Sequence, residues 1–135
     1  MTAAKRRGTA WETLAVNYLK DNHNPRAHRN VQMGAKDIGD LDGYYLHAVE
    51  NKDEQTLRFS AYIEQARREA GHAGQPFGVA FVKRRRKGVA DGYAVRDLET
   101  DVRLINRLRD AEEIAQQYAP ADVWKAHYEQ HGEGH

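Results

Sequence analysis

The chain has no cysteine, only three prolines and two methionines among its 135 residues, and no long apolar run. The absence of cysteine excludes disulfide bonds, thiolate zinc sites and a cysteine nucleophile. No segment approaches the ~20 apolar residues needed to cross a bilayer. The first residues, MTAAKRRGTAWE, are basic but lack the apolar stretch of a secretory signal. We therefore expect a cytoplasmic protein that does not associate with a membrane.

The charges of the chain almost cancel. Lysine and arginine number 21 and acidic residues 20, for a net charge of +1. A nucleic-acid partner must therefore be argued from where the charges lie rather than from their sum. With 40% hydrophobic residues, the chain is long enough to bury a core. We expect a single domain over residues 1–135, in which residues 120–135 form a C-terminal helix and a flexible tail.

Hydrophobic periodicity predicts the order of the elements. An apolar stripe at helical spacing consists of Trp11, Leu14, Ala15, Tyr18 and Leu19. We expect Thr9 to cap this helix, with Glu12 completing a capping box. Further helices are predicted at 57–73, 98–118 and 121–130, and strands at 27–33, 76–82 and 91–98, with a strand, a turn at Asp42–Gly43 and a second strand over 37–52. The pattern predicts an α/β fold with a mixed sheet of about five strands flanked by helices.

Three charged residues lie where the sheet is expected. Glu50 and Lys52 alternate along one strand and so share a face, and Asp40 on the preceding strand can reach them if the two strands pair. Converging carboxylates form an oxygen site suited to Mg²⁺ or Mn²⁺, beside which a lysine can orient water or neutralise charge on phosphorus. The alternative is a solvent-facing strand pair, because such spacing also arises by chance when 30% of residues are charged.

The motifs together resemble the PD-(D/E)xK nuclease superfamily, in particular phage-encoded, archaeal-type Holliday junction resolvases and their RecB-like relatives. The family's helical G-x-x-x-E pattern is matched by GTAWE, from Gly8 to Glu12. Its strand-borne acid is matched by Asp40 in KDIGDLDG, and its E-x-K by Glu50, Asn51 and Lys52. The resemblance spans roughly residues 8 to 110. One departure is that glycine, not proline, precedes Asp40.

The resemblance implies a restriction-endonuclease-like core and Mg²⁺-dependent cleavage of DNA, with Mn²⁺ as a substitute. Asp40, Glu50 and the carbonyl oxygen of Asn51 would bind the metal, and Lys52 would position water. Glu12 would assist through a second metal or an ordered water, unless it is only the capping-box residue. Nearby Asp42 is a competing ligand. Asp37 is another competitor, but we interpret it as structural.

The resemblance also implies a four-way junction or other branched DNA as substrate, cut by a homodimer in the cytoplasm of the host cell if the chain is phage-encoded. Two equivalent sites suit the two strands of a junction. The exposed candidates for the dimer surface are Trp124 and Tyr128. Two weaker site candidates are Tyr62 and Gln65, since RecB-like relatives carry a glutamine and a tyrosine on the corresponding helix, although in a different order.

A basic run provides the predicted contact with DNA. We expect phosphate binding by Lys83, Arg84, Arg85, Arg86 and Lys87, extended by Arg29. Two alternatives keep DNA as the partner: a RecB-like exonuclease or flap nuclease, and a non-catalytic DNA-binding module. The last alternative is a purely structural protein that does not act on DNA. The histidines, including His127 and His131 four residues apart, are interpreted as exposed rather than as a zinc site.

Overall fold

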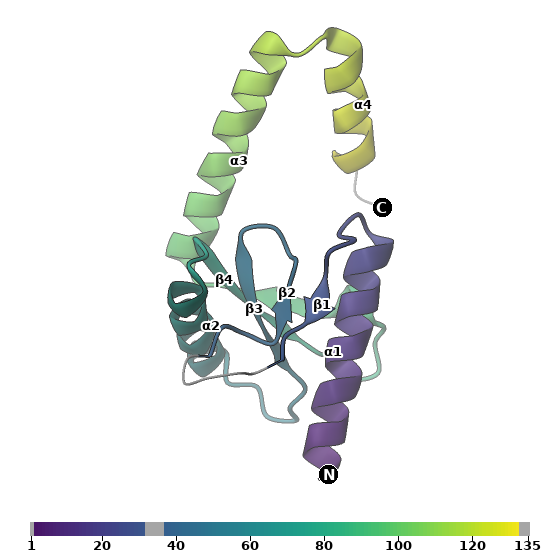
Figure 1. The fold of residues 1–135 in the computed structure, drawn as a ribbon, viewed down its shortest axis with the longest axis vertical. Coiled ribbons are helices and arrows are strands. Elements are labelled where there is room, and N and C mark those ends of the chain that lie inside the picture. Colours follow the sequence, from purple (N-terminus) through teal and green to yellow (C-terminus); the bar gives the residue numbers. More distant parts are fainter. Residues whose placement is uncertain (1, 32–36, 133–135) are drawn as a thin grey trace. The chain divides into compact units, whose positions relative to one another are not determined.

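The computed structural model describes residues 2–31 and 37–132, and the chain divides after Thr100 into two compact units. The first unit contains a five-stranded sheet in the order β1-β2-β3-β4-β5 (Figure 1). Its strands are β1 (His28–Arg29), β2 (Leu41–Asp42), β3 (His47–Lys52), β4 (Phe77–Val82) and β5 (Tyr93–Val95). Only β3 and β4 run parallel, and the other neighbours are antiparallel. The predicted α/β fold with a mixed sheet flanked by helices is confirmed.

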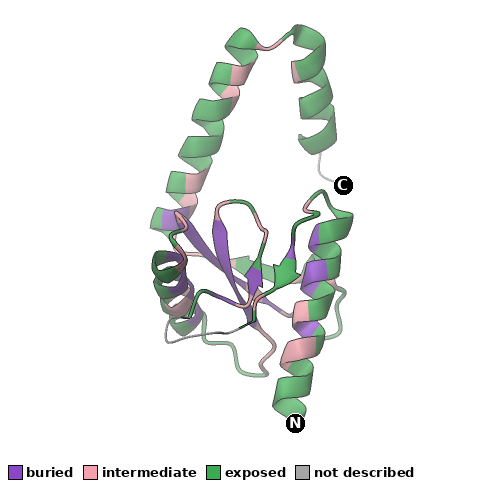
Figure 2. Cartoon of the chain, in the orientation of Figure 1, coloured by how far each residue is buried: buried purple, intermediate pink, exposed green. Residues whose placement is uncertain are grey.

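Two helices pack on opposite faces of the two central strands. On one face, Val49 and Val79 pack against the apolar side of α1 (Ala3–Asp21). On the other face, Ala80 and Val82 pack against Tyr62 of α2 (Phe59–Ala73), the crossover that joins the parallel strands. Burial is concentrated on these strands and on the helix sides that face them (Figure 2). Even-numbered residues of β3 therefore face α2.

The approach of α2 to the sheet depends on a glycine. A Cβ added to Gly78 of β4 would lie 2.4 Å from the carbonyl oxygen of Ala66 on α2. Glycine at this position therefore lets the helix lie directly on the strand. The same contact brings side chains of α2 close to those of β3, where the predicted site lies.

The start of α1 differs from the prediction. The helix begins at Ala3, where the hydroxyl of Thr2 accepts a hydrogen bond from the Lys5 backbone N–H at 3.1 Å. Thr9 lies inside the helix, and its carbonyl oxygen accepts a hydrogen bond from the hydroxyl of Thr13. The capping-box interpretation of Glu12 is therefore wrong. The buried side also differs from the predicted stripe, because Leu14 and Tyr18 are exposed; it consists of Trp11, Ala15, Val16 and Leu19.

The remaining elements follow the predicted order. The strand predicted at 27–33 is reduced to β1, and residues 32 and 33 lie outside the described residues. The basic run forms a loop after β4, followed by the short 3-10 helix η1 (Val89–Asp91). The predicted hairpin is present, but its turn lies later than the predicted Asp42–Gly43, because Asp42 belongs to β2 and the connection to β3 runs over residues 43–46, with Gly43 at a φ of 84°. Of the predicted tail, residues 133–135 also lie outside the described residues.

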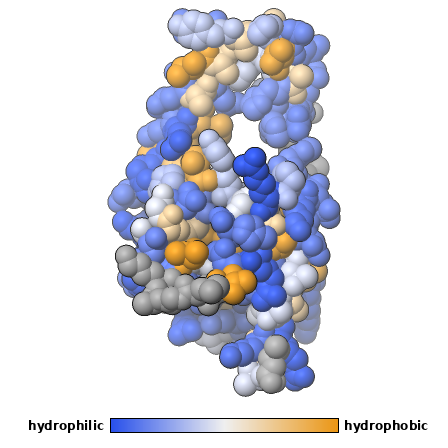
Figure 3. All heavy atoms as spheres, viewed as in Figure 1, coloured by the Kyte–Doolittle hydropathy of each residue, from blue (hydrophilic) through white to orange (hydrophobic). Residues whose placement is uncertain are grey.

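The second unit contains most of α3 (Leu98–Tyr118) and all of α4 (Ala121–His131), which begins after Pro120 as predicted. Apolar side chains of α3, including Val102, Ile105 and Leu108, are about half exposed. Hydrophilic side chains dominate the face of the molecule seen in Figure 3. Among residues 2–31 and 37–132, no helix is long and apolar enough to cross a membrane.

Candidate metal and active site

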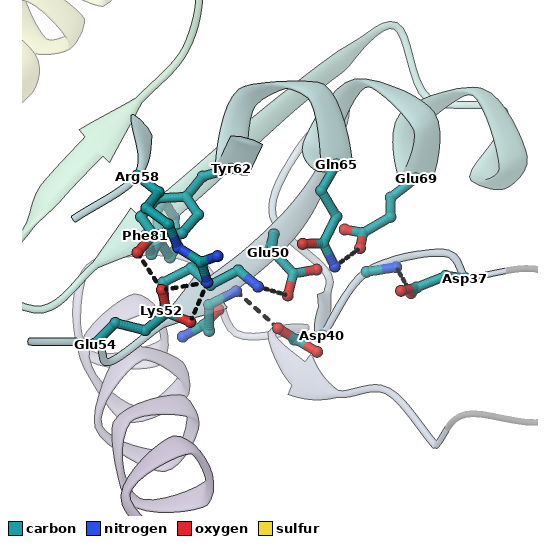
Figure 4. Close-up of polar contacts among 12 residues, drawn as sticks. Asp37, Asp40, Glu50, Lys52, Glu54, Arg58, Tyr62, Gln65, Glu69 and Phe81 are labelled. Atoms are coloured by element: carbon teal, nitrogen blue, oxygen red, sulfur yellow. Dashed lines mark hydrogen bonds and ion pairs between the residues drawn. The ribbon is translucent and has the colours of Figure 1, made fainter. Parts of the chain in front are cut away.

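The three charged residues singled out in the sequence lie together (Figure 4). Glu50 of β3 is buried, and its Oε1 lies 3.5 Å from the Nζ of Lys52 two residues along the same face. Asp40 directly precedes β2, and its Oδ2 accepts a hydrogen bond of 2.7 Å from the backbone N–H of Asn51. That bond fixes the Asp40 carboxylate beside β3. The predicted convergence of Asp40, Glu50 and Lys52 is present.

The helix α2 adds a third acidic residue, Glu69, which the sequence interpretation missed. Its side chain is only 1% exposed, and Gln65 donates a hydrogen bond of 3.0 Å to its Oε1. The signal was available, since Glu69 falls at the helical spacing of the buried Tyr62, Ala66 and Ala70. A glutamate within an apolar stripe is unusual enough to indicate a site.

Asp37 also belongs to this group. Its Oδ1 accepts a hydrogen bond of 3.0 Å from the backbone N–H of Gly39. Carboxylate oxygens of Asp37, Glu50 and Glu69 all lie within 4.8 Å of one another. The structure therefore brings Asp37 into the acidic cluster, in addition to the structural role that was predicted for it.

Burial and mutual proximity change the acidity of these groups. Burial, followed by the charge of Glu50, raises the pKa of Asp40 to about 7. Burial, followed by hydrogen bonding with Glu69, raises the pKa of Glu50 to about 8. Burial is also the main cause that raises the pKa of Glu69 to about 7. Burial and proximity therefore favour the protonated forms of these three carboxyl groups near neutral pH. A bound cation would favour their ionised forms.

The oxygens present fit a divalent metal ion. The Oε2 atoms of Glu50 and Glu69 are buried, and neither has a hydrogen-bond partner in the described part of the chain. Carboxylate oxygens are the ligands that Mg²⁺ and Mn²⁺ prefer. Of the predicted ligands, Asp40 and Glu50 are adjacent. The Asn51 side chain is on the other face of β3 and its backbone N–H binds Asp40, whereas ligation by its carbonyl oxygen stays a prediction.

Glu12 of α1 lies within electrostatic reach of Asp40. Burial raises the pKa of Glu12, a hydrogen bond from Arg29 opposes that rise, and the charge of Asp40 adds to it. The Nε of Arg29 lies 2.8 Å from the Glu12 carboxylate. Arg29, predicted to contact DNA, is thus paired with a predicted catalytic residue. By contrast, Asp42 is exposed and accepts a hydrogen bond from the Gly43 backbone N–H.

A second set of side chains lies beside Lys52; Tyr62 was one of the weaker candidates from the sequence, whereas Glu54 and Arg58 were missed. The Tyr62 hydroxyl donates a hydrogen bond to the carboxylate of Glu54, which also accepts from Arg58 at 3.2 Å. The hydrogen bond from Tyr62 is the main cause that lowers the pKa of Glu54. The Nζ of Lys52 lies 5.5 Å from the centre of the Tyr62 ring, within cation–π range. These contacts hold the loop after β3 against α2.

The basic loop begins beside Lys52, because the Lys83 backbone N–H donates to the Lys52 carbonyl oxygen at 2.9 Å. The Nζ of Lys83 lies 3.9 Å from Asp53, and the Arg84 guanidinium stacks at 5.1 Å on the Tyr93 ring. The other three basic residues of the loop are exposed, and none forms an ion pair with any described residue; they are Arg85, Arg86 and Lys87. A cleft of about 290 Å³ lies between this loop and Glu54.

Comparisons of the chain with protein-family models, with curated proteins and with solved structures found no match. A functional proposal therefore depends on the chemistry of the site itself.

Proposed function

We propose that the chain is a metal-dependent endonuclease that hydrolyses phosphodiester bonds in branched DNA, with a restriction-endonuclease-like core. The observation that carries the proposal is the convergence of Asp40, Glu50 and Lys52, with the buried carboxylates lacking enough donors. An ordinary surface ion pair would not require burial of Glu50 to 5% exposure.

Each residue of the site would have a separate role. Asp40 and Glu50, with the Asn51 carbonyl oxygen, would hold Mg²⁺ or Mn²⁺. A divalent cation supplies polarisation of a phosphate oxygen and a lower pKa for bound water. Lys52, held between Glu50 and the Tyr62 ring, would orient the attacking water and offset charge on the phosphate. Glu12 would act on the same site from α1 through its proximity to Asp40.

The basic loop supports DNA as the polymer that is cut. Arg85, Arg86 and Lys87 present cations to solvent, and the loop begins at the backbone of Lys52. Contacts with phosphates attract DNA without reading its sequence, as a nuclease selective for DNA structure requires. The four-way junction and the homodimer belong to this proposal through the resemblance to resolvases, because two equivalent sites match the two strands to be cut.

The test is a cleavage assay on purified protein with labelled four-way junction, linear duplex and single-stranded DNA, in Mg²⁺ and in EDTA. The variant Asp40→Asn removes a predicted ligand, and Asp42→Asn is its matched control, an exposed aspartate two residues away. We expect paired nicks in the junction only, lost in EDTA and in Asp40→Asn and retained in Asp42→Asn.

Other results would contradict the proposal in defined ways. Cutting of linear or single-stranded DNA would replace the junction substrate with the exonuclease or flap-nuclease alternative. Binding of DNA without any cleavage would favour a non-catalytic DNA-binding module. Equal activity of Asp40→Asn and the unmodified chain would exclude the site described above.

A further inference from the structure

Glu69 occupies a position where a carboxylate is costly. It lies on the sheet-facing side of α2 among Tyr62, Ala66 and Ala70, and it is 1% exposed. An apolar residue there would extend the core, whereas a buried carboxylate lacking donors destabilises the fold. Gln65 donates to its Oε1, and no donor in the described ranges reaches its Oε2. The ionised form of Glu69 therefore has no donor for its Oε2, and a bound cation would take the place of that donor.

The unpartnered oxygen points toward a group of other acidic oxygens. A Cβ added to Gly39 would lie 3.4 Å from the Oε2 of Glu69, which places that oxygen beside the segment that carries Asp37. The ring of His72 contacts the backbone carbonyl oxygen of Asp37 at 2.8 Å, so α2 also holds that segment in place. Glu50 completes the group with its own unpartnered Oε2.

This group differs in its members from the one beside Lys52, with which it shares Glu50. Glu50 uses its Oε1 toward Lys52, and Asp40 is tied to the backbone of β3 through Asn51. Asp37 and Glu69 lie on the other side of Glu50, next to α2 (Figure 4). Glu50 therefore stands between two sets of oxygens and can contribute one oxygen to each.

We propose that Glu69 holds a divalent cation together with Asp37 and the Oε2 of Glu50, at a position separate from the one that Asp40 and Glu50 share beside Lys52. The proposal deepens the proposed function and rests on it for the catalytic use of the first cation. Three carboxylates from a loop, a strand and a helix form an oxygen site that suits Mg²⁺ or Mn²⁺. The cation supplies the partner that the buried Glu69 lacks, and it joins α2 to β3.

The test counts bound Mn²⁺ on the full chain without DNA, by the loss of the free-ion electron paramagnetic resonance signal. We expect two ions per unmodified chain and one in Glu69→Gln, because glutamine lacks the charge that the ion requires. Asp37→Asn is the second variant, since asparagine can still accept the hydrogen bond from Gly39. The matched control is Glu64→Gln, an exposed glutamate of α2, and it should bind two ions.

Far-ultraviolet circular dichroism of each variant establishes that it is folded before ions are counted. Two ions bound by both Glu69→Gln and Asp37→Asn would overturn the proposal, as would a single ion on the unmodified chain. The cleavage assay run on the same preparations separates this inference from the nuclease proposal. Two ions in the unmodified chain and one in Glu69→Gln, without cleavage of any DNA, would uphold the second cation position and reject the nuclease.

Discussion

At the scale of single residues, the buried carboxyl groups make the stability of the metal-free protein depend on pH. The pKa values of Asp40, Glu50 and Glu69 rise to about 7, about 8 and about 7. Folding therefore favours their protonated forms, so their contribution to stability is complete below the ordinary carboxyl pKa and is lost as pH rises through about 7 to 8. Each pKa unit corresponds to about 1.4 kcal/mol, so we expect a fall of several kcal/mol.

Urea unfolding in EDTA at about pH 5, about pH 7 and about pH 8.5 measures this fall. Mg²⁺ should restore much of the lost free energy of unfolding at the highest pH, because it binds the ionised carboxylates of the folded state. Glu50→Gln removes the central carboxyl and should flatten the pH profile. A metal-free protein whose stability increased from pH 5 to pH 8.5 would contradict the assigned pKa directions.

Strand alternation was enough to predict that Glu50 and Lys52 share a face, because a period of two leaves no other arrangement. The proximity of Asp40 followed from pairing of neighbouring strands. Glu69 could not be placed in the same way. It lies 19 residues from Glu50 along the chain, and only the packing of α2 on β3 brings the two together. Contacts of that kind depend on the tertiary structure rather than on local spacing.

At the scale of the helices and strands, alanine substitutions of two glycines in the first unit are expected to change the free energy of unfolding in opposite directions. Gly78→Ala would place a methyl group 2.4 Å from the Ala66 carbonyl oxygen and force α2 away from β4. We expect a loss of about 1–3 kcal/mol in the free energy of unfolding, measured by urea denaturation. Cation binding should weaken as well, because Glu69 moves with α2.

Gly71→Ala is the matched control for this substitution. Gly71 is inside α2, and a Cβ there meets no atom within 4 Å. Because alanine favours the helix over glycine, we expect the free energy of unfolding to rise by about 0.5–1 kcal/mol. Equal effects of the two substitutions would mean that close packing of α2 on β4 does not contribute to stability.

The order of the elements was predictable because apolar runs and helix breakers are local signals. The beginning of α1 was not, since Thr2 and Thr9 are both acceptable caps in sequence. The structure distinguishes the two, because the helix already includes Gly8 and Thr9 and is therefore capped by Thr2. The apolar stripe of α1 was also displaced, because Val16 rather than Leu14 or Tyr18 faces the sheet. Which side of a helix is buried depends on the surface against which it packs.

At the scale of the whole molecule, we expect the affinity for DNA to fall as the salt concentration rises, because the basic loop would contact phosphates. Replacing Arg85, Arg86 and Lys87 with glutamine removes three exposed cations. The slope of log affinity against log salt should decrease in magnitude by about 0.9 for each lost phosphate contact. Fluorescence anisotropy with labelled DNA at several salt concentrations measures the slope.

The control for the loop variant removes the same charge elsewhere. Arg103, Arg107 and Arg109 of α3 lie in the second unit, and their replacement with glutamine changes the net charge equally. We expect this variant to retain most of the salt dependence. Equal losses in the two triple variants would show that total charge, rather than the position of the loop, determines binding.

The division after Thr100 predicts that the first unit folds without the second. In the described part of the chain, no residue from 101 to 132 is buried, so a chain ending at residue 104 loses no core side chain. The bond of 2.9 Å from the Thr100 N–H to Asp97, which begins α3, is kept. We expect a free energy of unfolding within about 1 kcal/mol of the full chain, and unchanged Mn²⁺ binding.

The same two chains test the predicted homodimer. Truncation removes exposed apolar side chains that the second unit offers for a contact between copies, among them Ile105, Leu108 and Tyr128. Sedimentation should show a dimer for the full chain and a monomer for the shortened one. A shortened chain that still dimerises would move the interface to the first unit. One that fails to fold would show that α3 and α4 stabilise the sheet, contrary to the division after Thr100.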